Sequence, residues 1–102
     1  MIKKILELKT EVTYQNDSVV SKLISASTGG TITLFAFSKG QKLSEHSAPF
    51  DAMVQVLEGN GETVISGEKF SLIEGQTIIM PKNEPHAVNA LTDFKMLLTM
   101  IK

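Results

Sequence analysis

Two histidines, His46 and His86, are the residues of this 102-residue chain from which a functional site would have to be built. They lie 40 positions apart, so they cannot share one helix face or one local turn. They can act together only if a closed or folded sheet brings their strands side by side. The chemistry open to the chain therefore depends on how its strands pair.

Other residue types exclude several kinds of catalytic site. The chain has no cysteine, which removes thiolate catalysis, disulfides and cysteine-type zinc sites. No G-x-S-x-G sequence is present for a nucleophile elbow, and no helix is expected after Gly59-Asn60-Gly61 to make it a phosphate loop. The methionines are expected to line a core or a pocket rather than to be redox-active, and this set comprises Met53, Met80, Met96 and Met100.

Alternating apolar and polar residues dominate the segment from Gly40 to Asn89, which is the period-2 pattern of half-buried strands. Short strands separated by turn residues predict an all-β fold, an antiparallel sandwich or barrel. No amphipathic segment of ordinary helix length is present. The expected strands cover residues 19–26, 31–37, 42–47, 52–58, 63–66, 70–73, 77–80, 86–91 and 94–101.

Three local expectations follow from particular segments. Gly59-Asn60-Gly61 predicts a tight hairpin between the strands on either side of it. The strand at 31–37 has large or apolar residues on both faces, so both faces should be covered. At the N-terminus, Lys3–Leu8 fits a single helical turn almost as well as an edge strand.

Length and charge narrow the class of protein. A chain of 102 residues is expected to form one domain, 1–102, that buries roughly 60–65% of its unfolded surface and needs no metal to fold. The net charge is −1 and the ten basic residues are scattered lysines, so nucleic-acid binding is not expected. The N-terminus lacks the apolar core of a signal peptide. Neither secretion nor membrane insertion is expected, and a cytoplasmic location is the default.

Two stretches resemble the sequence motifs of the cupin superfamily. Residues 40–59 resemble G-x5-H-x-H-x3,4-E-x6-G, and residues 75–86 resemble G-x5-P-x-G-x2-H-x3-N. The positions that match at the family's spacing are Gly40, His46, Gly59, Gly75, Pro81 and His86. This resemblance covers about half of the chain and implies a single-domain jelly-roll β-barrel with an interior pocket. It also implies a homodimer made by pairing edge strands, and the apolar segment at 94–101 is expected to supply such an edge.

Within residues 40–86, three positions depart from the family's pattern. Ala48 stands in place of the second histidine and Ala52 in place of the glutamate, so half of the family's 3-His-1-Glu ligand set is absent. Asn83 replaces a glycine, and asparagine can adopt the left-handed conformation that such a turn requires. If His46 and His86 keep the family's inward direction, they could weakly hold a divalent transition metal such as Zn, Ni, Cu or Fe. Alternatively, each histidine is an interior residue hydrogen-bonded to a neighbour or to water.

Gln55 is the candidate for a third metal ligand. Alternation places Ala52, Val54 and Val56 on the face of the family's glutamate, so Gln55 reaches that face only if a bulge re-aims it. The favoured alternative is that its amide makes a hydrogen bond across the sheet or at a subunit contact. Asp51 lies one residue from an inward position and is better explained as a solvated loop carboxylate.

Three functions remain compatible with the sequence. The favoured one is a pocket that binds a small molecule and, through His46 and His86, a divalent metal. The second is a metal-dependent cupin enzyme of dioxygenase, isomerase or decarboxylase type, which needs further ligands. The third is a structural dimer without an active metal site.

Overall fold

The computed structural model describes residues 2–102, which form nine β-strands and, within that range, no helix. Accordingly, no helix in this range is long and apolar enough to cross a membrane. The strands are β1 (Val19–Ser27), β2 (Gly30–Phe37), β3 (Lys42–His46), β4 (Asp51–Glu58), β5 (Gly61–Ile65), β6 (Glu68–Leu72), β7 (Thr77–Met80), β8 (His86–Ala90) and β9 (Phe94–Ile101).

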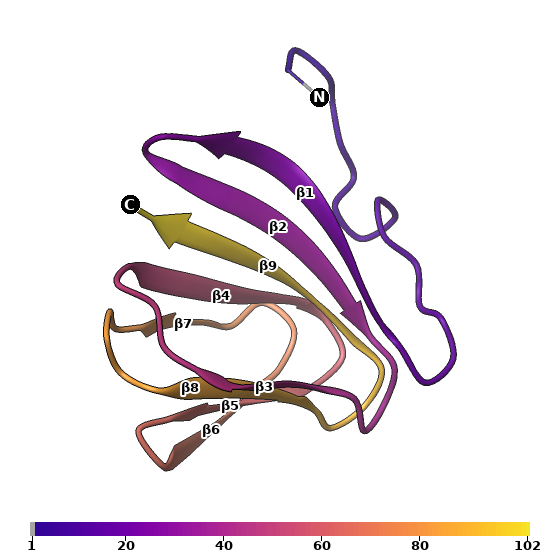
Figure 1. The fold of residues 1–102 in the computed structure, drawn as a ribbon. Coiled ribbons are helices and arrows are strands. Elements are labelled where there is room, and N and C mark those ends of the chain that lie inside the picture. Colours follow the sequence, from indigo (N-terminus) through magenta and orange to yellow (C-terminus); the bar gives the residue numbers. More distant parts are fainter. Residues whose placement is uncertain (1) are drawn as a thin grey trace.

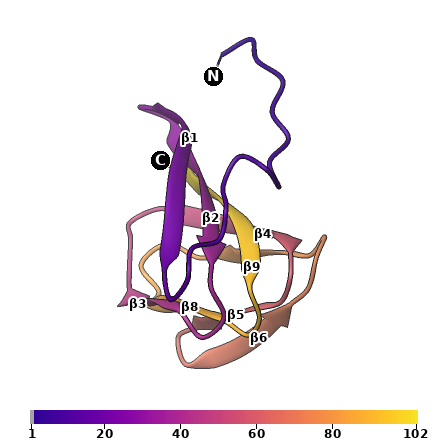
Figure 2. The same cartoon turned by 90° about the vertical axis from the view of Figure 1, so that its right-hand side faces the viewer.

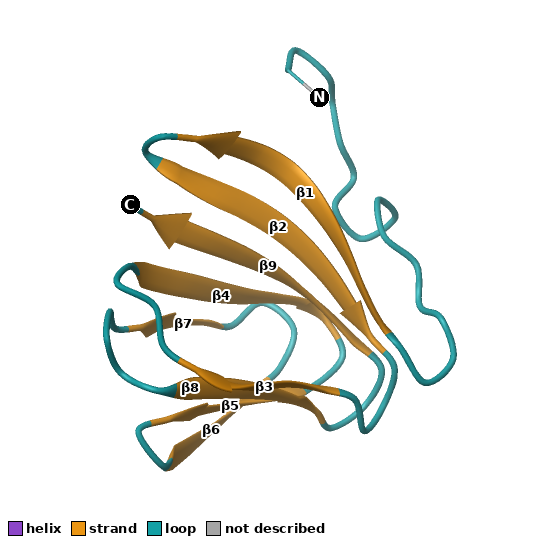
Figure 3. Cartoon of the chain, in the orientation of Figure 1, coloured by secondary structure: helices purple, strands orange, loops and turns teal. Residues whose placement is uncertain are grey.

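The strands make two antiparallel sheets that face each other (Figures 1 and 3). One sheet has five strands in the order β1-β2-β9-β4-β7, and the other has four in the order β3-β8-β5-β6. Strands β1 and β2 extend beyond the four-stranded sheet (Figure 1). The predicted all-β jelly roll is confirmed, and the predicted strands agree with the observed ones to within a few residues.

The main core lies between the sheets and follows from the alternation along each strand. On β4, Ala52, Val54 and Val56 are at most 2% exposed, while the residues between them are only partly buried. The rings of Phe37 and Phe94 stack with their centroids 4.6 Å apart, where β2 ends and β9 begins. Burying each such large side chain contributes about 1.5–3 kcal/mol.

A second apolar cluster covers the outer face of the five-stranded sheet. Leu34 and Ala36 of β2 are fully buried there against Val12, so both faces of β2 are covered, as predicted. The N-terminal segment that supplies Val12 runs beside β1 and β2 (Figures 1 and 2). The prediction of a helical turn or an edge strand at Lys3–Leu8 is wrong, because a turn forms later, where Thr10 and Glu11 donate to the Glu7 carbonyl.

Lys95 of β9 links the sheet to this N-terminal segment through contacts with Lys9 and Tyr14. Its ammonium group is buried, donates to the Lys9 carbonyl and lies 5.0 Å from the centroid of the Tyr14 ring. The Glu58 carboxylate lies 3.9 Å from Lys95 Nζ and accepts a hydrogen bond of 2.6 Å from the Tyr14 hydroxyl. Burial and this carboxylate raise the pKa of the Tyr14 hydroxyl. The buried lysine is tolerated because its charge is partnered.

The predicted Asn-Gly hairpin is wrong, because β4 and β5 belong to different sheets. The chain crosses between the sheets at Gly59-Asn60-Gly61, and only Gly59 there has a clearly positive φ, of 75°. A Cβ at Gly59 would collide with the Asp93 carbonyl, so the residue must be glycine for close approach as well as for conformation.

The predicted edge strand at the C-terminus is also wrong. Strand β9 lies between β2 and β4 and is hydrogen-bonded on both sides. The edge strands are instead β1 and β7 in one sheet and β3 and β6 in the other. The apolar residues of β9 therefore belong to a central strand and do not form a free sheet edge.

Candidate functional site

A bulge in β3 places His46. Leu43 pairs with Val88 and His46 pairs with His86, so three steps along β3 match two along β8. In a regular strand, Leu43 and His46 would point to opposite faces, because side chains alternate. The extra residue puts both side chains on the face that lines an interior cavity.

His86 is placed by the turn that precedes β8. Asn83 has a φ of 67°, the left-handed conformation predicted for it. The Asn83 amide donates to the Ala48 carbonyl at 2.7 Å and thereby joins the loop before β8 to the loop after β3. The ends of the two histidine-bearing strands are held together by this contact.

The two imidazole rings meet edge to face between the sheets. Nε2 of His46 lies 3.2 Å from Nε2 of His86, and the ring centroids are 4.4 Å apart with 72° between the planes. Nδ1 of His46 lies 2.8 Å from the Ser44 carbonyl oxygen, and Nδ1 of His86 lies 3.2 Å from the Glu84 carbonyl oxygen. Backbone carbonyls therefore fix both rings in orientation.

These three contacts need more protons than two neutral rings carry. A carbonyl oxygen only accepts, so each Nδ1 must hold a proton in order to donate to it. A neutral imidazole has a single N–H, so two bare Nε2 lone pairs face each other at 3.2 Å when both Nδ1 atoms donate. A ring that carries its proton on Nε2 instead donates it to the other Nε2 and gives up its carbonyl contact. With both protons on Nδ1, a metal ion between the two Nε2 atoms removes this repulsion. Histidines that ligate metals commonly donate their other N–H to such a carbonyl.

The pair forms the polar end of an otherwise apolar cavity of about 240 Å³. Its remaining walls come from both sheets and consist of Phe35, Leu43, Ala52, Met80, Val88, Met96, Leu98 and Met100.

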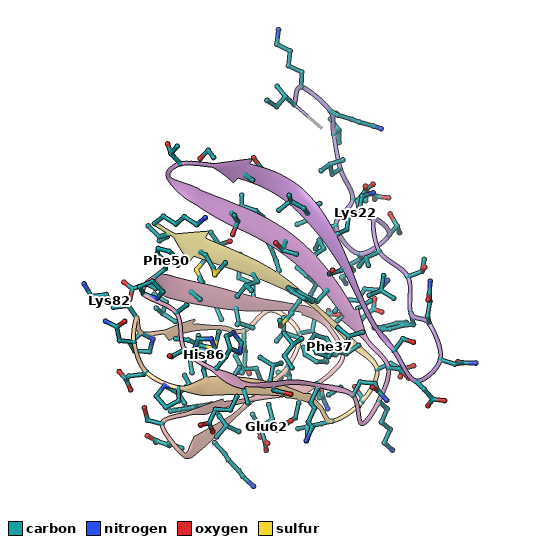
Figure 4. The ribbon with its side chains drawn as sticks, viewed as in Figure 1. Lys22, Phe37, Phe50, Glu62, Lys82 and His86 are labelled. Carbon is teal, nitrogen blue, oxygen red and sulfur yellow. The ribbon has the colours of Figure 1, made fainter. Side chains whose placement is uncertain are left out.

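The two histidines differ in exposure. His86 is 4% exposed and points from β8 into the space between the sheets (Figure 4), whereas His46 is exposed. Burial, and secondly the neighbouring His46, lower the pKa of His86, while its contact with the Glu84 carbonyl acts in the opposite direction. A proton on His86 is therefore disfavoured relative to a free imidazole.

Gln55 is not brought to the histidine pair. It lies between the buried Val54 and Val56, its side chain is on the outer face of β4, and it does not line the cavity. The bulge in β4 occurs later, between Val56 and Glu58, so it does not re-aim Gln55. Asp51 is also directed elsewhere, since its carboxylate accepts a hydrogen bond of 3.0 Å from the Lys82 amide.

The 3-His-1-Glu ligand set implied by the sequence motifs does not fit this chain. Ala52 lines the cavity with a methyl group where the carboxylate would be, and Ala48 is absent from the lining. Within residues 2–102, no group of three or more His, Cys, Asp or Glu side chains is arranged to hold a metal ion. Of that set, the chain retains two imidazoles.

Three methionines line the cavity, in agreement with the expectation that they would line a core or a pocket. Met80 and Met100 both pair with Ala52 and so flank it in one row across β7, β4 and β9. No pattern in the sequence predicts this placement. The spacing of Met80 and Met100 in the sequence does not indicate that they flank Ala52. That arrangement arises because β7 and β9 are the two neighbours of β4.

The family model described as "Cupin domain" matches residues 33–102. No curated protein matches the chain.

Solved structures give close matches over nearly the whole chain. A conserved protein of unknown function from Streptococcus pyogenes is 41% identical, with a TM-score of 0.93 over 98% of this chain and 88% of that one. A cupin 2 conserved barrel domain protein from Leptotrichia buccalis is also 41% identical, with a TM-score of 0.92 over 95% of this chain. The match covers 47% of that protein, so this chain spans about half of its length. An RmlC-like cupin protein from Desulfovibrio desulfuricans is 33% identical, with a TM-score of 0.86 over 96% of this chain and 95% of that one.

Proposed function

The chain belongs to the cupin family, and we propose that it is a binding protein whose barrel cavity holds one compact, mainly apolar small molecule. A polar group of that molecule contacts His46 and His86. The observation that carries the proposal is the cavity itself, in which two imidazoles stand among eight apolar side chains. A cavity of about 150 Å³ holds benzene. The volume of about 240 Å³ found here suits a single substituted ring.

A metal-dependent cupin enzyme is the alternative function, and the convergence of the two Nε2 atoms favours it. A bound divalent ion would polarise an oxygen of the substrate as a Lewis acid. However, with two neutral imidazoles and no carboxylate, the charge of such an ion is left uncompensated in an apolar cavity, which disfavours tight binding. We therefore place weak binding of Zn, Ni, Cu or Fe at His46 and His86 second to small-molecule binding. A structural dimer with an empty cavity is the third candidate.

The test uses the chelator-treated chain and three probes that share one ring: benzoate, benzyl alcohol and toluene. A ligand that binds only the folded chain raises its stability according to its concentration and affinity. All three probes should therefore raise the thermal midpoint. Benzoate and benzyl alcohol should do so more than toluene, because only they carry a polar group for the imidazoles.

Variants separate the cavity from the histidine pair. His86→Leu should abolish the advantage of benzoate over toluene but retain toluene binding. Ala52→Leu fills the cavity and should abolish binding of all three probes, whereas Gln55→Leu, on the outer face of the same strand, should change nothing. If no probe binds the wild type and Ala52→Leu is destabilised by overpacking, the space is a packed core and the proposal fails.

A further inference from the structure

Met80 and Met100 stand on either side of Ala52 in one row of the five-stranded sheet. Ala52 pairs with Met80 between β4 and β7, and with Met100 between β4 and β9. Directly paired residues point to the same face, and neighbouring strands lie about 4.8 Å apart. Both thioether side chains therefore project into the cavity beside the Ala52 methyl group, and all three residues line it.

Because Ala52 has a small side chain, the cavity between the side chains of Met80 and Met100 is not filled at this position. A glutamate at this position, as in the family's motif, would fill the gap between them. Methionine is unbranched with three rotatable bonds, so its sulfur can adjust to a ligand in such a gap. Alanine at position 52 thus places only a methyl group between the two methionines, where the family's motif has a carboxylate.

The histidine pair faces this row from the other sheet. His46 on β3 and His86 on β8 line the same cavity as the two methionines. Their Nε2 atoms lie 3.2 Å apart, and both lone pairs are free for a cation when each ring carries its proton on Nδ1. Two nitrogens bound to one tetrahedral ion at about 2.0–2.1 Å each lie roughly 3.3 Å apart, so the observed separation fits two ligands of one ion.

The donor set selects a kind of ion. Two neutral imidazoles and two thioethers carry no negative charge, so a monovalent ion leaves less uncompensated charge in the cavity than a divalent one. Thioether sulfur is a soft ligand that selects Cu(I), whereas hard ions such as Mn²⁺ prefer oxygen ligands. No oxygen ligand stands among the residues that line this cavity.

We propose that His46, His86, Met80 and Met100 form a binding site for one Cu(I) ion in place of the divalent ion that a four-ligand cupin site would hold. This goes beyond the proposed small-molecule binding, although both use the histidine pair. The ion lies at the polar end of the cavity, and the apolar remainder of the cavity is left to an organic ligand.

The test is a competition experiment on the untagged, chelator-treated chain. Cu(I) is titrated without oxygen against the colorimetric chelator bicinchoninate, and Zn²⁺ is titrated against a zinc-binding dye. The wild type should bind one Cu(I) per chain, and more tightly than Zn²⁺. Met80→Leu and Met100→Leu should each weaken Cu(I) binding at least about tenfold, since even changes beyond the direct ligands cost this much. Zn²⁺ binding should not change in these variants.

Met53→Leu is the matched control, because Met53 lies next to Ala52 on β4 but on the outer face, away from the cavity. It should bind Cu(I) like the wild type. As a second measurement, Ag⁺, a redox-inert substitute for Cu(I), should shift the methyl NMR signals of Met80 and Met100 but not that of Met53. This measurement uses the wild type, so it does not depend on the folding of a variant.

Either of two results would overturn the Cu(I) site: Met80→Leu combined with Met100→Leu binds Cu(I) as tightly as the wild type, or the wild type binds Zn²⁺ more tightly than Cu(I). The ring-containing probes are tested on metal-free protein without either ion. If the probes do not bind, the Cu(I) result still stands. If Cu(I) does not bind, the result with the probes still stands.

Discussion

At the scale of single residues, His86 links stability to pH. Burial and the neighbouring His46 lower its pKa in the folded chain, whereas in the unfolded chain it keeps its ordinary value of about 6.5. As the pH falls below about 6.5, the unfolded chain therefore takes up a proton that the folded chain resists. The stability that neutral His86 contributes is fully present above that pH and is lost on acidification.

We expect the free energy of unfolding of the metal-free chain, measured in urea, to fall between pH 7.5 and 5.5 more in the wild type than in His86→Phe. The limiting slope for one proton is about 1.4 kcal/mol per pH unit. Comparison of the two proteins isolates His86 from the carboxylates that also titrate. Equal losses in both proteins would contradict the assigned direction of the pKa shift.

Thr63 offers a second test at this scale. Its side-chain oxygen is buried on β5 and has no hydrogen-bond partner among residues 2–102. An unpaired buried hydroxyl costs about 1–3 kcal/mol, and valine replaces it with a methyl group of similar size. Thr63→Val should therefore raise the free energy of unfolding by about 1 kcal/mol, while Thr77→Val, at an exposed position, should have little effect. A less stable Thr63→Val variant would mean that the hydroxyl has a partner, such as an ordered water.

At the scale of elements, the bulge in β3 decides the direction of His46. Three steps along β3 match two along β8, so deleting Glu45 alone restores regular alternation with the histidine still facing inward. Deleting Ser44 and Glu45 together places the histidine next to Leu43, on the opposite face. The single deletion should keep the NMR contact between the two imidazole rings, and the double deletion should lose it. Loss of the contact between the imidazole rings in the single-deletion variant would show that the bulge does more than determine which face of β3 His46 occupies.

In the molecule as a whole, a row of three apolar residues and one threonine crosses the outer face of the five-stranded sheet and ends on the edge strand β7. Ile32, Thr99, Met53 and Ile79 are paired in turn across β2, β9, β4 and β7. Ile79 is 59% exposed, and Ile101 nearby is 64% exposed. An exposed apolar row next to an unpaired strand edge is a typical site of self-association.

We therefore expect a homodimer that covers this face. Sedimentation velocity should show a dimer of the wild type at micromolar concentration and a monomer for Ile79→Lys. Leu23→Lys is the control, because Leu23 is 57% exposed but lies on β1, at the other edge of the sheet. A wild-type monomer at this concentration would rule out the expectation.

Local sequence patterns predict where the strands lie and, outside the bulges, which of their residues face inward. Ala52, Val54 and Val56 are buried as their alternation predicts, and Asn83 adopts the left-handed conformation expected of its turn. The two motifs also identified both histidines and the two missing ligands. These features are local: strand alternation and turn conformation depend on residues within a few positions of one another.

Which strands are neighbours follows from the complete fold and not from local patterns. The fold placed β4 and β5 in different sheets in spite of the Asn-Gly turn, and β9 in the centre of a sheet in place of an edge. It also supplied the bulge that turns His46 inward and the row that brings Met80 and Met100 beside Ala52. Alternation assigns each residue a face but carries no information about the partner strand. That choice depends on how all nine strands together bury their apolar faces, which is a property of the whole fold.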